Sequence, residues 1–268
     1  MIDFSNLKNV LLDAAFEAGD AIMDVYHEQE DQVQYKDDKS PVTKADEEAE
    51  NIILQKLSAS YSAIPVIAEE AVSCGKITST DERYFFLVDP LDGTKEFITR
   101  RQDFTVNIAL IDNTLPIAGI VYAPAQRTAW LGIENRAEKI LRDTNQHQPI
   151  RVSTACAETG KRAVVSLSHN SEETEAYLKN FSIAERVSYG SSIKFCMIAE
   201  GAADMYPRFG RTMEWDTAAG DAVLRAAGGR TITVDEKPLC YGKRNQANDC
   251  DFANPFFIAD NSQLTDYV

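Results

Sequence analysis

The sequence carries little positive charge for its size. Its 268 residues include 27 lysines and arginines against 42 aspartates and glutamates, a formal net charge of −15. This balance argues against a protein that binds nucleic-acid polymers, because such proteins need a basic surface to neutralise phosphates. It does not exclude phosphate chemistry, since an acidic protein can hold cations that in turn bind a phosphate group.

Cysteines and long apolar runs are also scarce. The five cysteines form no CxxC pair, which argues against a disulfide framework and against a thiolate zinc site. The first residues lack the basic start and apolar stretch of a signal peptide. The apolar run at 106–111 is too short to span a bilayer and is broken by Asn107. We therefore expect a cytoplasmic protein without a transmembrane segment.

The hydrophobic fraction of 44% is enough for a substantial core. Apolar residues at helical spacing predict helices over 7–25 and 43–57, separated by a polar loop or hairpin at 28–39. Continuous β-rich runs predict strands at 65–68, 84–88, 105–111, 117–122 and 128–133. After Pro149 the pattern alternates, with strands expected at 163–167, 204–206 and 230–234 and helices at 172–180, 193–200 and 217–227.

This order of elements predicts an α/β protein with layered helices and sheets. The first half reads as a helix pair followed by a sheet, and the second half alternates helices and strands. We expect two subdomains, 1–150 and 151–268, with a boundary near 145–155. A cleft between such halves is where a functional site is expected.

The most informative segment is the run Asp89-Pro-Leu-Asp92-Gly-Thr-Lys-Glu-Phe97. An apolar strand predicted to stop at Asp89 gives way there to two aspartates three residues apart. Pro90 stiffens the turn and Gly93 permits close approach of the backbone. Oxygen ligands at this density suit Mg²⁺, and the amides after Gly93 could face a phosphate oxygen.

Two further acidic groups stand at the ends of predicted elements. Glu69 and Glu70 follow the strand at 65–68, and Asp216 precedes a helix of small residues that it can cap. Clustered carboxylates raise one another's pKa unless cations compensate their charge. The three groups together predict a site for two or three metal ions.

These motifs resemble those of the inositol monophosphatase superfamily, whose members are Mg²⁺-dependent, lithium-sensitive phosphatases. The motifs occur in the family's order and span most of the chain: Glu69-Glu70, Asp89-Pro-Leu-Asp92-Gly-Thr94 and Trp215-Asp216-Thr-Ala-Ala-Gly220. The resemblance implies an inositol-monophosphatase-like αβαβα sandwich with two subdomains.

Further segments narrow the resemblance to one bacterial branch, the 3′(2′),5′-bisphosphate nucleotidases of the CysQ type. These segments are Phe104–Ile111, Gly190–Cys196, Ala199–Gly201 and Tyr206–Gly210. The resemblance implies removal of the 3′-phosphate of adenosine 3′,5′-bisphosphate, a by-product of sulfate assimilation, to give AMP and phosphate.

Carried over by position, the resemblance also implies the metal ligands. One Mg²⁺ would be held by Glu69, Asp89 and the Leu91 carbonyl, and a second by Asp89, Asp92 and Asp216. A third, weaker ion would lie near Glu69 and Glu70. Asp46 and Thr94 would orient and deprotonate a water for in-line attack, with no covalent phosphoenzyme and with Glu70 as a further catalytic acid.

The substrate contacts implied by the resemblance come from both halves of the chain. The phosphate would be contacted around the metal motifs by Glu69, Leu91, Gly93, Thr94, Lys95 and Asp216. The nucleotide would be selected by His169, Ser191, Lys194 and Arg208. Lys194 and Arg208 suit a second phosphate, which an inositol monophosphate lacks.

Simpler interpretations of the same residues stay open. Glu70 and Asp221 would then be surface acids, Asp46 an acid of a first helical turn, and Lys95 a surface partner of Glu96. Lys194 would extend from a helix to the solvent. The competing functions are an inositol or sugar monophosphatase on the same fold and a non-catalytic nucleotide or metal sensor.

The expected partner is a small-molecule nucleotide rather than a nucleic-acid polymer. A homodimer is an open expectation. Peripheral attachment to the cytoplasmic side of the inner membrane, as described for some members of the branch, is also open, although the sequence has no obvious anchor.

Overall fold

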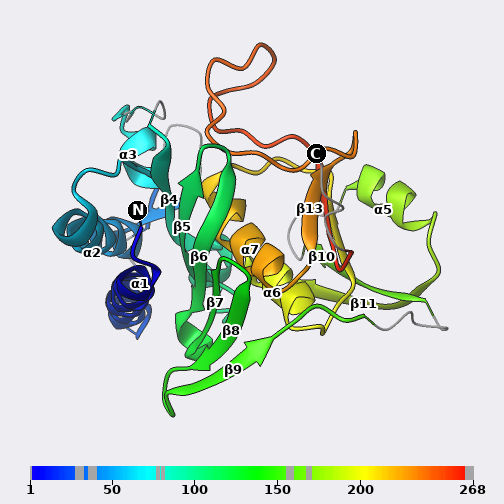
Figure 1. Cartoon of the computed structure of the whole chain (residues 1–268), viewed down its shortest axis with the longest axis horizontal. Coiled ribbons are helices and arrows are strands. Elements are labelled where there is room, and N and C mark those ends of the chain that lie inside the picture. The colour runs from blue at the N-terminus through cyan, green and yellow to red at the C-terminus, as the bar shows by residue number, and fades with distance from the viewer. Residues whose placement is uncertain are drawn as a thin grey trace.

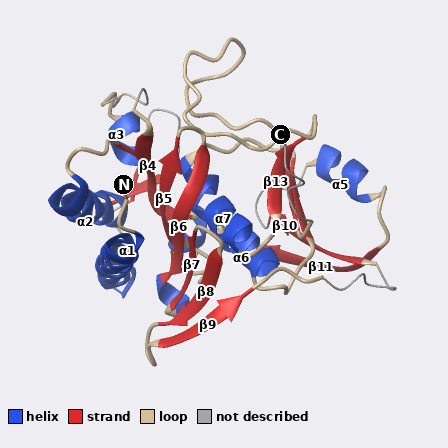
Figure 2. Ribbon diagram, in the orientation of Figure 1, coloured by secondary structure: helices blue, strands red, loops and turns tan. Residues whose placement is uncertain are grey.

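The structure is a computed structural model, and it describes residues 2–27, 33–35, 41–76, 79, 82–154, 160–166 and 171–262. From one side to the other it consists of two helices, a seven-stranded sheet, two more helices, a five-stranded sheet and a last helix (Figure 1). Figure 2 shows the same alternation of helical and strand layers. The predicted αβαβα sandwich is therefore confirmed.

The first layer contains α1 (Phe4–His27) and α2 (Lys44–Tyr61). Both form because apolar residues recur on one face, which in α1 is buried from Leu7 to Val25. Between the two helices, β1 (Val33–Tyr35) and β2 (Pro41–Thr43) pair as an antiparallel hairpin. The two predicted helices are thus present, and of the stretch 28–39, predicted as a loop or hairpin, the structure describes only β1.

The second layer is a seven-stranded sheet in which the strands follow chain order. Only β3 and β4 are parallel, and every later neighbouring pair is antiparallel. The strands are β3 (Val66–Ala68), β4 (Tyr84–Asp92), β5 (Thr105–Asp112), β6 (Leu115–Ala123), β7 (Thr128–Ile133), β8 (Arg136–Leu141) and β9 (Gln146–Ile150). A short 3₁₀ turn, Pro124–Gln126, joins β6 to β7.

This sheet is covered on both faces, and β4 shows how. Phe86 and Val88 pack in the core shared with α1 and α2, whereas Phe85 and Leu87 pack in the core shared with the helices on the other face. Alternate residues of a strand point to opposite faces. A strand buried on both faces therefore reads as a continuous apolar run, as the sequence had suggested.

The second half of the chain supplies the remaining layers. Two helices, α6 (Ile193–Ala199) and α7 (Trp215–Ala226), lie between the sheets, and α5 (Glu172–Leu178) covers the outer face of the second sheet (Figure 1). That sheet has the order β11 (Ile183–Tyr189), β10 (Lys161–Ser166), β12 (Met205–Arg208), β14 (Phe257–Asp260) and β13 (Arg230–Thr233).

Helix α7 ties the two halves together. A Cβ atom on Gly119 of β6 would lie 2.8 Å from the Ala219 carbonyl oxygen, and one on Gly132 of β7 would lie 2.6 Å from Val223 Cα. Larger residues would push the helix away, so these glycines let it pack directly on the first sheet. The subdomain boundary predicted near 145–155 follows β9 in the chain, and it stays a prediction.

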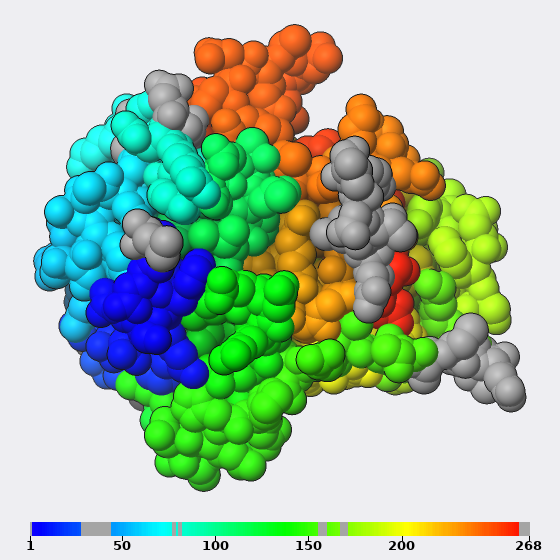
Figure 3. Space-filling model, in the orientation of Figure 1, coloured from blue at the N-terminus to red at the C-terminus, as the bar shows by residue number. Residues whose placement is uncertain are grey.

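The segment between β13 and β14 projects from the body of the molecule and is drawn in orange at the top of the space-filling view (Figure 3). Its first part is fixed to α7, because the Tyr241 hydroxyl donates to Asp221 and the Gly242 amide donates to Glu214. Among the described residues, no helix is long and apolar enough to cross a bilayer.

Candidate active site

Two neighbouring strands deliver acidic residues to the same place. Parallel pairing sets Ala68 beside Val88, so Glu69, the first residue of α3 (Glu69–Ser73), emerges next to Asp89. Asp89 continues the Phe85–Leu87 side of β4 and is only 1% exposed. Strand alternation therefore directs its carboxylate toward α7.

A bulge brings Asp92 to the face of Asp89. Asp89 pairs with Asn107 on β5 and Asp92 pairs with Thr105, so three steps on β4 match two steps on β5. The extra residue is a β-bulge, which turns a side chain that would otherwise point to the other face. The strand was predicted to stop at Asp89, but β4 continues to Asp92. The bulge is what places the two aspartates on the same face.

The turn after the bulge is held by its own hydrogen bonds. The Leu91 amide donates to Asp89 Oδ1 at 3.1 Å, and Thr94 Oγ1 donates to the Leu91 carbonyl at 3.2 Å. Gly93 has φ of +91°, and a Cβ there would lie 3.1 Å from the Asp103 carbonyl oxygen. Glycine suits this left-handed, crowded position, from which α4 (Thr94–Ile98) begins.

The third acidic motif arrives from α7. Asp216 lies in the first turn, where its Oδ2 accepts a hydrogen bond from the Met213 amide at 2.8 Å. The Met213 amide precedes the helix, whose N-cap is Glu214 and which has no side-chain cap, so the prediction that Asp216 caps the helix is wrong. Ser192, just before α6, donates from Oγ to the Asp216 carbonyl oxygen at 2.6 Å and fixes the position of that turn.

These acids form one electrostatic cluster. Burial raises the pKa of Asp89 well above its usual range, and the negative charges of Glu69, Asp92, Asp216 and Asp46 raise it further. Burial, with the charge of Asp92, also raises the pKa of Asp216 to about 7. Grouped carboxylates shift in this direction because each opposes the ionisation of the next.

Two cationic side chains border the cluster. Lys194 is 6% exposed and Arg208 is 8% exposed. Burial lowers the pKa of Lys194 to about 8, whereas the charge of Asp92 opposes that shift. Burial raises the pKa of Asp92, and the charge of Lys194 opposes that increase. The cations therefore lie within electrostatic reach of the acids.

Backbone and aromatic groups position these cations. Lys194 Nζ donates to the carbonyl oxygen of Ser191 and lies 5.4 Å from the ring centroid of Tyr206. Ser191 itself has φ of +46°, a left-handed conformation uncommon for serine. Arg208 donates to the Arg211 carbonyl at 3.1 Å. Lys194 is thus buried and oriented, rather than extended to the solvent.

The structure does not bring every predicted residue into this group. Lys95 is exposed on α4. Glu70 lies beside Glu69 in α3, where its amide donates to Glu50 Oε2 at 2.8 Å. His169 lies outside the described residues. In the described part of the chain, no three or more His, Cys, Asp or Glu side chains are arranged as a ready-made metal site.

Sequence reasoning missed three polar residues around the cluster. Glu50, on α2, accepts a hydrogen bond from the Glu70 amide at the start of α3. Ser192 donates one to the carbonyl oxygen of Asp216. Asn107, on β5, contacts both Asp92 and Ser192. The signal for Asn107 was available, because it interrupts an otherwise apolar strand.

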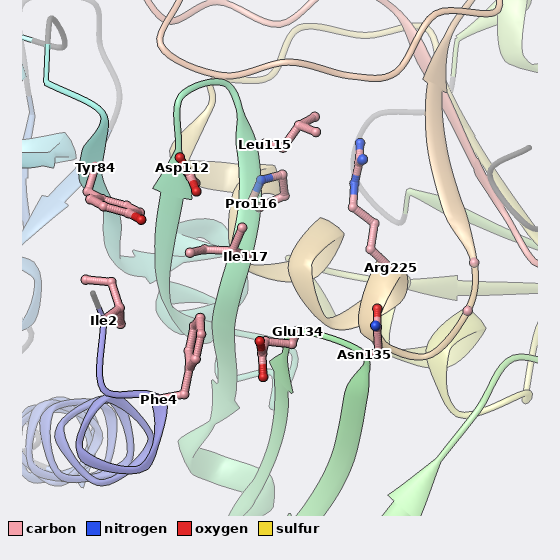
Figure 4. Close-up of a pocket in the computed structure, with 12 residues that line it drawn as sticks. Ile2, Phe4, Tyr84, Asp112, Leu115, Pro116, Ile117, Glu134, Asn135 and Arg225 are labelled. Carbon is pink, nitrogen blue, oxygen red and sulfur yellow. The ribbon is translucent and has the colours of Figure 1, made fainter. Parts of the chain in front are cut away.

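A separate groove of about 680 Å³ lies at the opposite ends of the same elements (Figure 4). Its lining includes Tyr84, at the start of β4, and Arg225, near the end of α7, whereas the acidic cluster uses Asp92 and Asp216 at the other ends. The groove is therefore distinct from the candidate active site.

Comparison with known proteins gives one consistent picture. A model of the inositol monophosphatase family matches residues 3–258. The 3′(2′),5′-bisphosphate nucleotidase CysQ of Escherichia coli strain K12 is 44% identical over 241 residues, covering 90% of this chain and 94% of that protein. The CysQ nucleotidase of Haemophilus influenzae is 29% identical over 98% of this chain and 95% of its own length.

Solved structures agree with the sequence matches. The crystal structure of CysQ from Bacteroides thetaiotaomicron superposes with a TM-score of 0.80 at 35% identity, covering 98% of this chain and 99% of that one. The inositol monophosphatase from Anabaena superposes with a TM-score of 0.76 at 23% identity, covering 97% and 92%, which supports the fold alone. The family resemblance inferred from the motifs is confirmed.

Proposed function

Because the chain belongs to the inositol monophosphatase family, we propose that it is a 3′(2′),5′-bisphosphate nucleotidase that hydrolyses the 3′-phosphate of adenosine 3′,5′-bisphosphate to AMP and phosphate. One observation carries the proposal. An acidic cluster of buried Asp89 and half-buried Asp92 and Asp216 is bordered by two buried cations, Lys194 and Arg208. The acids suit a metal-dependent phosphatase, and the cations suit a second phosphate.

The donor chemistry of the cluster fits Mg²⁺. Carboxylate and carbonyl oxygens are the ligands that this hard cation takes, and the raised pKa values indicate that the cluster needs positive charge. We assign one ion to Glu69, Asp89 and the Leu91 carbonyl, a second to Asp89, Asp92 and Asp216, and a weaker third near Glu69 and Glu70. Bound Mg²⁺ would supply charge neutralisation and electrophilic catalysis.

Side chains of the protein would activate the attacking water and contact the reacting phosphate. Thr94, held by the Leu91 carbonyl, and Asp46, buried in the first turn of α2, orient the attacking water and accept its proton. The water attacks phosphorus in line with the departing 3′ oxygen. Gly93 contributes a contact to the reacting phosphate just before α4, whereas a contact from the exposed Lys95 is proposed from the sequence alone.

Substrate selection belongs to the second half of the chain. Lys194 and Arg208 would neutralise the 5′-phosphate, and their burial strengthens that attraction because solvent screens it less. Ser191 contributes a polar contact beside Lys194. A role for His169 in nucleotide binding is proposed from the sequence alone.

The deciding experiment compares phosphate release from adenosine 3′,5′-bisphosphate and from inositol 1-phosphate, each with Mg²⁺ and with a chelator. We expect Mg²⁺-dependent release from the nucleotide and little from the inositol phosphate. Preference for inositol phosphate would replace the substrate and keep the metal site. Release from neither would favour the non-catalytic sensor.

The cytoplasmic location, the homodimer, a place in sulfur metabolism and inhibition by lithium remain predictions. Size-exclusion chromatography with light scattering tests the homodimer, and adding Li⁺ to the phosphate-release assay tests the inhibition.

A further inference from the structure

One polar side chain interrupts the apolar strand β5 beside the acidic cluster. Asn107 lies between Val106 and Ile108, which pack in the core under α1 and α2, and it points to the opposite face. It is 1% exposed and stands directly across from Asp89 in the strand register. An amide is costly to bury in such a place unless its hydrogen bonds compensate.

The contacts of Asn107 join the two acidic motifs. Its Nδ2 lies 3.1 Å from Ser192 Oγ and 3.4 Å from Asp92 Oδ2, the latter at the long end of the hydrogen-bond range. Ser192 Oγ in turn donates to the Asp216 carbonyl oxygen. A continuous chain of hydrogen bonds therefore runs from Asp92 on β4, through β5 and the start of α6, to the first turn of α7.

Folding stability alone does not explain this side chain. Its Oδ1 is buried and has no hydrogen-bond partner among the described residues, which costs free energy that an apolar residue of similar size would avoid. An aspartate here would add a further negative charge to the cluster. Asparagine provides donors and stays neutral, which is what a connection between two acidic segments requires.

We propose that Asn107 is a positioning residue that sets the separation of Asp92 and Asp216 through Ser192. The inference rests on the proposed function, since it assigns these two aspartates to one Mg²⁺. Ser192 also hydrogen-bonds Asp92 directly, so without the amide the two residues stay connected, but both lose the bond that fixes them to β5. The ion is then bound less tightly and the reacting phosphate is held less accurately.

The test uses Asn107→Leu, which keeps the size of the side chain, and Asn107→Ala, in case leucine does not fit. Mg²⁺ affinity is measured by calorimetry without substrate, kcat and KM with adenosine 3′,5′-bisphosphate, and stability by thermal unfolding. We expect Mg²⁺ affinity and kcat each to fall about tenfold, with KM little changed. At least one variant should keep the melting temperature of the parent.

A matched control is available in the other sheet. Thr231, on β13, is also fully buried, and its side-chain oxygen has no hydrogen-bond partner in the part of the chain that the structure describes. Thr231→Val should change neither Mg²⁺ affinity nor kcat. A double variant with Ser192→Ala should lose less than the sum of the single losses, because both residues act through one chain of hydrogen bonds.

The possible results distinguish the positioning role of Asn107 from the proposed nucleotidase function. Asn107 variants that fold and bind Mg²⁺ as the parent does, with unchanged kcat, would overturn the inference and leave the proposed function standing. A loss of melting temperature with unchanged Mg²⁺ affinity would also overturn it, since the role would be structural. A parent chain that neither binds Mg²⁺ nor releases phosphate would overturn both.

Discussion

Asp216 and Asp221, five positions apart on α7, have opposite electrostatic surroundings. Asp221 of α7 is fully buried, pairs with Arg225 Nε at 2.8 Å and accepts a hydrogen bond from the Tyr241 hydroxyl at 3.0 Å. Asp216, in the first turn of the same helix, faces the charge of Asp92, and burial together with that charge raises its pKa to about 7. The Asp221 carboxylate is thus neutralised by a cation of the same helix, whereas the Asp216 carboxylate lies among other carboxylates.

The contrast between Asp221 and Asp216 shows how a structural carboxylate can be distinguished from a candidate metal ligand. Glu214 behaves like Asp221, because it is fully buried and accepts the amides of Gly242 and Lys243 as well as the Lys243 ammonium. A buried acid with matched donors holds segments together. A buried acid whose nearest charges are other acids costs stability, and such a cost is typical of a functional site.

The largest expected effect comes from removing the charge of a clustered aspartate. Asp216→Asn should reduce Mg²⁺-dependent phosphate release roughly a thousandfold, because a metal ligand contributes several kcal/mol to catalysis. The same change relieves repulsion, so the metal-free protein should be as stable as the parent or more so. Phosphate-release kinetics and urea unfolding with a chelator measure the two quantities. We expect Asp89→Asn to behave in the same way.

The matched control is Asp221→Asn, which should reverse the pattern. It leaves the half-buried Arg225 guanidinium without its counter-charge and should lower the free energy of unfolding by about 3 kcal/mol. The kcat of the folded variant should stay within about threefold of the parent, since Asp221 has no place in the proposed chemistry. If Asp216→Asn is the less stable of the two, the distinction between them is wrong.

A smaller effect is expected at Thr94, which supports the reaction without ligating metal. Thr94→Ala should lower kcat about a hundredfold, a typical contribution of groups that handle the proton of the attacking water. Mg²⁺ affinity measured by calorimetry should change little. Thr99→Ala is the control, because Thr99, just after α4, also donates to a backbone carbonyl, that of Lys95 at 2.8 Å. Unchanged turnover in Thr94→Ala would contradict its assignment.

The cations on the other side of the cluster should affect one substrate class only. Lys194→Met and Arg208→Met should each reduce kcat/KM for adenosine 3′,5′-bisphosphate roughly 10–100-fold, because each removes a charged hydrogen bond to the second phosphate. Hydrolysis of inositol 1-phosphate, which has no second phosphate, is the internal control. Equal losses on both substrates would assign these residues to the acidic cluster instead.

The same contrast explains which parts of the fold the sequence could predict. Helices α1 and α2 were predicted because their apolar residues recur at helical spacing, and strands β4 to β7 because their β-rich runs are continuous. Strands β9 and β11 were missed because most of their residues are exposed or half-buried and polar. Their existence depends on pairing with a neighbour, which local periodicity does not report.

At the candidate active site, too, the sequence does not report features that depend on strand pairing. The motif aspartates could be found in the sequence because several carboxylates stand together at the ends of predicted elements. The bulge that groups Asp89 with Asp92, and the contacts of Asn107, depend on the register between β4 and β5. The prediction that Asp221 is a surface acid was wrong, because α7 is buried between two sheets and its polar residues find partners inside.

The smallest expected effect is a pH dependence that belongs to Lys194. Burial lowers its pKa to about 8, so the free enzyme loses this positive charge as the pH rises through 8. Since kcat/KM reports the ionisation of the free enzyme, its value for adenosine 3′,5′-bisphosphate should fall about tenfold between pH 7 and 9. The profile for inositol 1-phosphate should be flat over this range, and Lys194→Met should flatten the profile for the nucleotide. A fall that persists in Lys194→Met would assign the titration to another group and would place Lys194 outside the recognition of the second phosphate.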